Sequence, residues 1–273
     1  MRETMDLARR VATTDAGVLI TGESGTGKEI LARAIHTYSH RAEKPLIPFN
    51  CAAVPREMLE SQLFGHRRGA FTGADRDNPG VIRAARGGTL FLDEIGELAI
   101  ELQPKLLRFL ESGEICPLGE TTPFTVDVRV IAATNARLEE AVKNGRFRED
   151  LFYRLHIVPL QIPPLRDRRD EIPALVHHFV TRASADYRKG QIRVAENTME
   201  QLLLFPCPAT FVSSTTNCDG WSRSPNRTPS SHLARSRPKS AARGPNLPQP
   251  AMPPRRTPVW KNSCRRWPAS NAT

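Results

Sequence analysis

The first 205 residues alternate short apolar runs with segments in which apolar residues recur every three or four positions. Short apolar runs bounded by turn residues are typical of buried strands, and the longer spacing is typical of amphipathic helices. Their alternation predicts an α/β fold of three layers, with a parallel sheet between helices. The predicted strands are residues 17–20, 46–50, 88–93, 126–132 and 156–160; the predicted helices include 29–39, 102–110, 172–180 and 197–205.

The chain divides into three parts by composition. A Pro163-Pro164 break ends the alternating pattern, so we expect an α/β core over residues 1–165 and a small helical part over 166–205. Residues 206–273 contain 12 prolines and 10 serines and few apolar runs. Such a segment buries too little apolar surface to offset the entropy of ordering it, so we expect a disordered tail.

The net charge of +10 comes from that tail. Residues 206–273 carry 11 Lys and Arg against the single acid Asp219, whereas residues 1–205 carry 28 bases and 28 acids. A basic tail can bind phosphate backbones without sequence preference. The charge therefore gives no reason to assign DNA binding to the predicted core.

Several classes of protein do not fit this composition. No stretch approaches the roughly 18 consecutive apolar residues of a membrane helix, and the N-terminus lacks the basic and then apolar profile of a signal peptide. The five cysteines are irregularly spaced, which suits neither a disulfide framework nor a paired zinc site. We expect a cytoplasmic protein with no membrane segment.

A glycine-rich loop follows the first predicted strand and opens the first predicted helix. In this arrangement backbone N–H groups and a helix N-terminus surround a polyphosphate, and a lysine reaches its β- and γ-phosphates. The alternative without a ligand is a glycine-rich turn with a solvated lysine. The final position is Glu, where the general motif has a Ser or Thr that binds Mg²⁺. The candidate phosphate-binding residues are Gly22, Glu23, Ser24, Gly25, Thr26, Gly27, Lys28 and Glu29.

Two adjacent carboxylates end the third predicted strand, Leu90-Phe91-Leu92-Asp93-Glu94. Ligands of open α/β sheets bind at the carboxyl ends of the strands. Asp93 is therefore a candidate to hold Mg²⁺ through water, and Glu94 is a candidate general base for an attacking water. Surface acids after a strand are the alternative, but an Asp-Glu pair after an apolar run is less common. Together with the loop, this strand predicts nucleotide hydrolysis.

With these residues, the chain resembles the AAA+ domain of bacterial enhancer-binding proteins, the NtrC-like ATPases that activate sigma-54 RNA polymerase. The resemblance extends over residues 1–205 and includes the glycine-rich loop with its terminal Glu29. The most specific segment is a hexapeptide that is close to a fingerprint of this family. The matching segments are Gly69-Ala70-Phe71-Thr72-Gly73-Ala74, Asn50-Cys51-Ala52-Ala53, Phe91-Leu92-Asp93-Glu94-Ile95-Gly96-Glu97-Leu98, Ala132-Ala133-Thr134-Asn135 and Phe147-Arg148-Glu149-Asp150-Leu151.

The resemblance implies a P-loop NTPase (AAA+) core with a partial helical lid, ATP and Mg²⁺ as cofactors, and a hexameric ring. Residues 69–74 would then be a mobile loop in which Phe71 and Thr72 contact sigma-54 and transmit each cycle of hydrolysis to its RNA polymerase. The alternative is a turn whose Phe71 is buried, as phenylalanines usually are.

The family also implies roles for four polar residues. Asn135 resembles the sensor of the γ-phosphate, and Asn50 resembles the switch that pairs with Glu94. Otherwise each asparagine would satisfy local backbone, which is its commoner role. Arg148 and Arg154 match the arginine fingers that act on the nucleotide of a neighbouring subunit. Their alternative is a set of surface ion pairs with Glu149 and Asp150, which stabilise little.

The chain departs from the family after residue 205. Members continue with a lid segment of the type Trp-Pro-Gly-Asn-Val-Arg-Glu-Leu, whose arginine senses nucleotide, whereas residues 205–212 read Phe-Pro-Cys-Pro-Ala-Thr-Phe-Val. Codons for residues 207–220 exist that, read in a shifted frame, give Pro-Gly-Asn-Val-Arg-Glu-Leu-Asp-Asn-Gln-Leu-Arg-Arg. We therefore expect a one-base frameshift near Cys207, in the gene or its sequencing.

The shifted frame would explain both the composition and the charge of the tail. On this hypothesis the sensor arginine is lost, and the specific DNA-binding domain usual in the family is expected to be absent, as is an N-terminal regulatory domain. Two other functions stay open: a binding-only remnant with impaired turnover and assembly, and a small-molecule P-loop kinase. The kinase is disfavoured because the sequence has no acceptor-site motif. The hexapeptide at residues 69–74, which is close to a fingerprint of the enhancer-binding family, also argues against a kinase.

Overall fold

The structure is a computed structural model of the 273-residue chain, and it describes residues 2–187, 190 and 192–204. The predicted disordered tail, the segment 205–212 and the frameshift near Cys207 therefore lie outside the described residues. Within the described part, none of the helices combines the length and the apolar character that a bilayer crossing requires.

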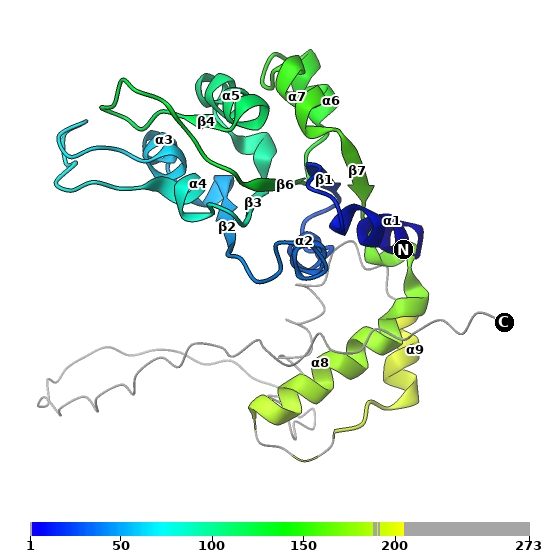
Figure 1. The fold of residues 1–273 in the computed structure, drawn as a ribbon. Coiled ribbons are helices and arrows are strands. Elements are labelled where there is room, and N and C mark those ends of the chain that lie inside the picture. Colours follow the sequence, from blue (N-terminus) through cyan, green and yellow to red (C-terminus); the bar gives the residue numbers. More distant parts are fainter. Residues whose placement is uncertain (1, 188–189, 191, 205–273) are drawn as a thin grey trace, which may run out of the picture. The chain divides into compact units, whose positions relative to one another are not determined.

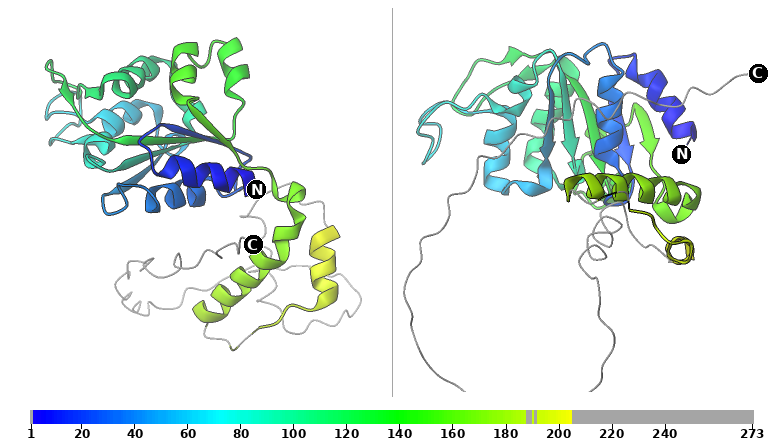
Figure 2. Two further views of the ribbon diagram at one scale, coloured as in Figure 1. Left: turned by 45° about the vertical axis from the view of Figure 1, so that its right-hand side comes forward. Right: turned by 90° about the horizontal axis from the view of Figure 1, so that it is seen from below.

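Five parallel strands form the central sheet in the order β2-β3-β6-β1-β7. The right-hand view of Figure 2 shows their arrows running in one direction. The strands in the middle of the sheet are rich in Val, Ile, Leu and Ala and are buried except at the last residues of β1 and β3, as expected for strands covered on both faces. Their bounds are β1 Val18–Thr21, β2 Leu46–Asn50, β3 Thr89–Asp93, β6 Arg129–Thr134 and β7 Val158–Gln161.

All five strands were predicted, and one was misplaced. The fourth strand was expected at residues 126–132, but β6 begins at Arg129 and ends at Thr134. Residues before Arg129 bond elsewhere, because the Val126 N–H donates to the Gly113 carbonyl at 2.8 Å. Nearby, β4 Glu114–Ile115 and β5 Phe124–Thr125 form a small antiparallel pair that the sequence pattern did not reveal.

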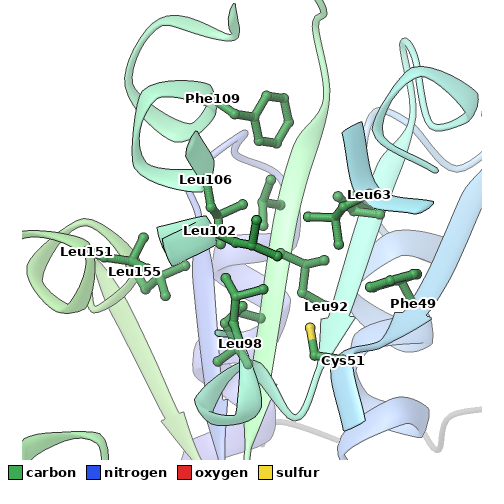
Figure 3. Close-up of a cluster of buried hydrophobic side chains, with 14 of the residues drawn as sticks. Phe49, Cys51, Leu63, Leu92, Leu98, Leu102, Leu106, Phe109, Leu151 and Leu155 are labelled. Atoms are coloured by element: carbon green, nitrogen blue, oxygen red, sulfur yellow. The ribbon is translucent and has the colours of Figure 1, made fainter. Parts of the chain in front are cut away.

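Alternate strand residues point into two hydrophobic layers. Val18 and Ile20 of β1 pack with the helices α1 Arg2–Ala12 and α2 Lys28–Thr37, whereas Leu19 packs into the larger cluster on the other face. Figure 1 shows α1 and α2 on one side of the sheet and α3 to α7 on the other. Figure 3 shows the larger cluster, to which Leu106 of α5, Leu151 and Leu155 of α7 and Leu92 of β3 all belong. The three-layer α/β prediction is confirmed.

The sequence pattern located α2, α5, α8 and α9 and missed the other helices, most of which are short. Helix α8 continues to Asp186, six residues beyond the predicted end. The remaining bounds are α3 Arg56–Phe64, α4 Gly80–Ala84, α5 Gln103–Ser112, α6 Leu138–Lys143, α7 Glu149–Leu155, α8 Ile172–Asp186 and α9 Glu196–Leu204.

Two short 3-10 turns connect β7 to the last helices. They occupy Leu165–Asp167 and Arg169–Glu171, and α8 begins at the next residue, Ile172. Leu165, Ile172 and Val176 form a third, small cluster, against which apolar residues of α9 pack while staying partly exposed. The chain leaving the sheet therefore passes directly into the predicted helical part.

Candidate functional site

The glycine-rich loop joins β1 to α2 at the carboxyl edge of the sheet. A side chain at Gly22 would place its Cβ 2.8 Å from the Ile162 carbonyl oxygen, so this position has room for glycine only. Lys28 begins α2, and its side chain is only 6% exposed. Its ammonium donates to the carbonyl oxygens of Gly22 at 3.0 Å and Glu23 at 3.3 Å. The lysine thus lies folded back over the loop that it follows.

The two carboxylates lie at the end of β3, beside this loop. Glu94 Oε1 lies 3.8 Å from Lys28 Nζ, and Glu94 Oε2 accepts a hydrogen bond from the Asn135 backbone N–H at 3.3 Å. Asp93 Oδ1 accepts from the Glu94 N–H at 3.0 Å. Because β1, β3 and β6 are parallel neighbours, the residues after their carboxyl ends meet here. The structure therefore brings Lys28, Asp93, Glu94 and Asn135 together.

Glu94 has a rare backbone conformation. Its φ of 52° and ψ of 47° are left-handed, and it is the one non-glycine residue with a positive φ in the part of the chain that the structure describes. For an L-residue this conformation costs about 1–2 kcal/mol. Such costs concentrate at functional sites, where the backbone must direct one side chain to one place. Here the conformation directs the carboxylate of Glu94 toward Lys28.

Asn50 is close by but makes a different contact from the expected one. Its side-chain oxygen accepts from the Ala52 N–H at 2.9 Å and caps the turn Cys51–Ala53. The predicted pair with Glu94 is absent among the contacts of the described residues, because Lys28 and Asn135 hold that carboxylate instead. Burial, with the negative charges of Asp93 and Glu94, raises the pKa of the neighbouring Cys51 thiol to about 12. Cys51 is buried and packs in the larger hydrophobic cluster.

The donor set suits Mg²⁺ better than a metal held by protein alone. No cluster of three His, Cys, Asp or Glu side chains occurs within the described ranges. Nucleotide-bound Mg²⁺ needs only one or two carboxylates, because phosphate oxygens and waters complete its octahedron. Asp93, partly exposed at the strand end beside the phosphate-binding loop, fits that requirement.

Residues 69–74 form the tip of a loop between α3 and α4. The Gly69 N–H donates to the Ala74 carbonyl at 2.9 Å, which closes the tip, and both Gly69 and Gly73 have positive φ. Phe71 is 45% exposed, and its ring lies edge-on to the His66 ring at 4.9 Å. The alternative in which Phe71 is buried in the core is therefore wrong. Thr72 is also exposed.

Ion pairs fix the base of this loop. Arg67 binds Asp77 across the loop at 2.8 Å and binds Glu120 of the next loop at 2.6 Å. The pKa of the Asp77 carboxyl is lowered, first by the Arg68 backbone N–H that it accepts and then by Arg67. The base is thus held while the tip extends into solvent.

Arg154 lies at the opposite edge of the sheet from the glycine-rich loop, whereas Arg148 lies at the other end of α7, where its backbone N–H donates to Gln103 Oε1 at 2.8 Å. Helix α7 precedes β7, whose first residue Val158 pairs with Val18, the first residue of β1. Arg154 accordingly lines a cavity of about 510 Å³ together with Gly17, just before β1. The structure does not bring these arginines to the Lys28 site of the same chain.

The two arginines make local contacts in this structure. Arg148 binds Asp150 at 2.6 Å, which raises the pKa of Arg148 and lowers that of Asp150. Arg154 donates through two nitrogens to the Leu110 carbonyl, at 2.7 and 3.1 Å. The expected ion-pair alternative therefore describes Arg148, whereas Arg154 caps the end of α5.

Two further arginines contact the glycine-rich loop and were not predicted. Arg166 forms a two-pronged pair with Glu23, with N···O distances of 2.5 and 2.9 Å, and lowers the pKa of that carboxyl. Arg168 is buried and donates to the Thr26 carbonyl at 2.8 Å. Their position directly after β7 was the available signal, since the carboxyl ends of parallel strands share one edge.

Comparison with known proteins decides the family. The model of the family "Sigma-54 interaction domain" matches residues 1–161. This chain belongs to the sigma-54 interaction domain family. It has the AAA+ P-loop NTPase fold, as predicted.

Relatives of this sigma-54 interaction domain are similar over most of its length. An uncharacterized protein from the HyuA 5' region of Pseudomonas sp. (strain NS671) is 47% identical over 223 residues, covering 75% of this chain and 76% of that protein. The transcriptional regulator NtrC of Rhizobium meliloti (strain 1021) is 51% identical over 186 residues, covering 68% of this chain and 38% of NtrC. The chain thus spans well under half the length of that regulator.

A solved structure agrees with the fold of this domain. The crystal structure of NtrX from Brucella abortus in complex with ATP matches with a TM-score of 0.73 and 36% identity. The match covers 80% of this chain and 50% of NtrX. The sheet and the helices that position the Lys28 site are therefore shared with a nucleotide-bound relative.

Proposed function

We propose that this chain is an ATP-hydrolysing module that acts on sigma-54 and remodels the closed complex of its RNA polymerase to activate transcription. The observation that carries the proposal is the 3.8 Å approach of Lys28 Nζ to Glu94 Oε1, from two different strand ends. The Lys28 ammonium can bind a phosphate and the Glu94 carboxylate can bind a water. The two groups lie at the edge of the sheet where α/β proteins bind ligands. The ATP bound by NtrX supports the choice of nucleotide.

In the proposed reaction the loop residues 22–29 bind the triphosphate through backbone N–H groups and Lys28. Glu94 orients a water and accepts its proton as the water attacks the γ-phosphorus and the bond to the β-phosphate oxygen breaks. Asn135 contacts the γ-phosphate, since its backbone already binds the Glu94 carboxylate. Mg²⁺, held through water by Asp93, would neutralise phosphate charge during this step.

Arg148 and Arg154 act on the nucleotide of a neighbouring copy in this proposal. Arg154 lies at the amino edge of the sheet and the phosphate loop lies at the carboxyl edge, so Arg154 does not reach the phosphate loop of its own copy. A head-to-tail ring, which the family resemblance suggests is a hexamer, would bring the edges together. Each arginine would exchange its present partner, Asp150 or the Leu110 carbonyl, for phosphate oxygens.

Residues 69–74 are the proposed contact with sigma-54. Phe71 and Thr72 are exposed at the tip of a loop whose base is fixed by ion pairs of Arg67. A loop with a fixed base can transmit a movement of the domain to a partner that binds its tip. Asn50 would report the nucleotide state by leaving the Ala52 N–H for the Glu94 carboxylate once a phosphate takes Lys28. The proposal places the chain in the cytoplasm, with the polymerase.

ATP turnover measured at increasing protein concentration tests this proposal. Arginines that act between copies predict that activity per chain rises with concentration and that Arg154→Ala removes the rise. The Arg137→Ala variant, which removes an exposed arginine that pairs with Glu140 of the helix that follows it, serves as the control. Turnover that stays at background while nucleotide still binds would reject the hydrolytic function and leave a binding-only remnant. A small-molecule acceptor that accelerates turnover would indicate the kinase instead.

The remnant is a second candidate because residues 205–212 depart from the family segment. A chain with the shifted frame restored after residue 206 provides the comparison. Greater turnover in the restored chain would support the remnant for the present sequence, whereas equal turnover would reject it. Resequencing codons 200–215 tests the frameshift itself.

A further inference from the structure

The segment after β7 is bound to the phosphate loop by two arginines that the proposed reaction does not use. Arg166 holds the Glu23 side chain, and Arg168 holds the Thr26 carbonyl. The partners of each contact are more than 140 residues apart in the chain. The segment between β7 and α8 is thus hydrogen-bonded to the loop that is proposed to bind the nucleotide.

Arg168 is the more informative of the two because it is buried. Its side chain is 6% exposed, with one terminal nitrogen on the Thr26 carbonyl at 2.8 Å and the other on Glu171 Oε2 at 3.2 Å. Its Nε is buried without an acceptor in the described part of the chain. An unsatisfied buried donor is unfavourable and calls for an explanation. The buried guanidinium connects the phosphate loop to Glu171, the residue before α8, through its two terminal nitrogens.

Hydrogen bonds, together with the backbone of Thr26, connect Lys28 to Glu171, the residue before α8. The Lys28 ammonium binds the Glu23 carbonyl, and the same carbonyl accepts from Thr26 N at 3.3 Å and from Thr26 Oγ1 at 2.9 Å. Thr26 then binds Arg168, which binds Glu171. Helix α8 begins at the next residue, Ile172. A phosphate that draws the ammonium away from the Glu23 carbonyl would therefore act on the first link of this path.

We propose that Arg168, supported by Arg166, is a positioning residue that transmits occupancy of the phosphate loop to α8. The inference rests on the proposed nucleotide binding and adds the route by which binding reaches the helical part. Arg168 fixes the position of the Thr26 carbonyl relative to the start of α8, because it binds both that carbonyl and Glu171. When phosphate oxygens occupy the loop, the Thr26 carbonyl shifts and Arg168 carries the shift to Glu171.

Hydrogen exchange of the full chain, with and without Mg²⁺ and a slowly hydrolysed ATP analogue, tests the route. We expect amide exchange in residues 172–186 to slow about tenfold with nucleotide, the effect of strengthening one charge-assisted hydrogen bond. Arg168→Ala should abolish most of this response while the Kd for the analogue, measured separately, changes less than about threefold. The control is Arg169→Ala, which removes the same charge from an exposed neighbour and should respond as the parent chain does.

Two gentler variants cover the case in which Arg168→Ala fails to fold. Arg168→Lys keeps the charge and loses the second prong, and Glu171→Gln keeps the loop contact and weakens the helix contact. Both should bind the analogue and show a reduced response in 172–186. A full response in Glu171→Gln, or in a folded Arg168→Ala, would overturn the route.

The outcomes also separate this inference from the proposed function. If the parent chain binds the analogue and residues 172–186 do not respond, the route is wrong and nucleotide binding stands. If the parent chain binds no analogue, both are wrong. If the response disappears in the Arg168 variants and persists in Arg169→Ala, the route is supported.

Discussion

The ammonium of Lys28 and the carboxylate of Glu94 lie 3.8 Å apart, although the residues belong to different strand–loop units. Both side chains are largely shielded from solvent, at 6% and 17% exposure. Truncating one partner of such a pair leaves the other poorly solvated. A phosphate bound by Lys28 would take over this pairing and release Glu94 to orient water.

Lys28→Ala should weaken nucleotide binding about 10- to 100-fold, the range for losing a charge-assisted contact. The fold should persist, because α2 also packs through Leu31 and Ile35. Equilibrium binding of a fluorescent ATP analogue gives the Kd. Lys143→Ala, at an exposed lysine ending α6, is the matched control, and equal Kd values for the two variants would contradict the assignment.

Glu94→Gln should separate binding from hydrolysis. The amide keeps the side-chain shape but cannot take the proton from water, so kcat should fall about 10²- to 10⁴-fold. The Kd for ATP should change less than about threefold, because Lys28 and the loop are unaltered. Single-turnover hydrolysis provides the measurement, and Glu97→Gln, at the exposed acid three residues on, provides the control. Near-normal kcat in Glu94→Gln would remove Glu94 from the reaction.

Phe71→Ala should disconnect the loop from its partner while sparing the nucleotide site. An aromatic anchor at the centre of an interface commonly contributes about 2 kcal/mol or more, so sigma-54 binding should weaken at least about 30-fold. Turnover of ATP without sigma-54 should stay within about threefold. Capture of sigma-54 in the presence of the ATP analogue measures the first effect. Met58→Ala removes another exposed apolar side chain and should bind normally, and equal loss in both variants would argue against a specific role for Phe71.

Stability should fall in mild acid because of His36. Its ring is buried behind β3, where Nδ1 lies 3.0 Å from Thr89 Oγ1, and burial lowers the pKa of this histidine, helped by the charge of Arg129. The unfolded chain therefore takes up a proton at a higher pH than the folded chain does. The free energy of unfolding is fully retained above the unfolded pKa of about 6.5 and declines as the pH falls below it.

Urea unfolding at a series of pH values between 8 and 5 measures this slope. One such histidine contributes at most about 1.4 kcal/mol per pH unit. His36→Gln should flatten the curve in this window, whatever its effect at pH 8. His177→Gln, on the exposed side of α8, should leave the slope unchanged. An unaltered slope in His36→Gln would show that the imidazole does not control it.

The sequence pattern located the sheet and the nucleotide site because both depend on local signals. Val18 to Ile20 and Leu90 to Leu92 are apolar runs that end in polar residues, and parallel pairing then places those polar ends together. The start of β6 was missed because Val126 and Val128 are apolar without belonging to the sheet. The first residue of β6, Arg129, is charged and would be expected at the surface. It is buried because its guanidinium donates to the Val11 and Ala12 carbonyls at the end of α1.

Contacts between distant segments were beyond such signals. The position of Arg168 after β7 indicates the edge of the sheet at which it lies, but not its contact with the Thr26 carbonyl, because that contact depends on the path of the chain after β7. The left-handed backbone of Glu94 was likewise invisible, since Glu has no preference for that conformation. The hydrogen bond that Asn50 accepts from the Ala52 N–H, in place of the expected pair with Glu94, depends on the local turn at Cys51–Ala53, which the sequence pattern did not indicate.

The separation of the Lys28 site from Arg154, at opposite edges of one sheet, has a consequence for how activity should scale with assembly. If the arginines serve the adjoining copy, the two contact surfaces differ, and a symmetric pair cannot use both of them. An open row of copies then has one complete site fewer than it has chains, with an idle phosphate loop at one end and idle arginines at the other. Closure of the row adds the missing junction, so the last copy to join completes two sites with a single arrival.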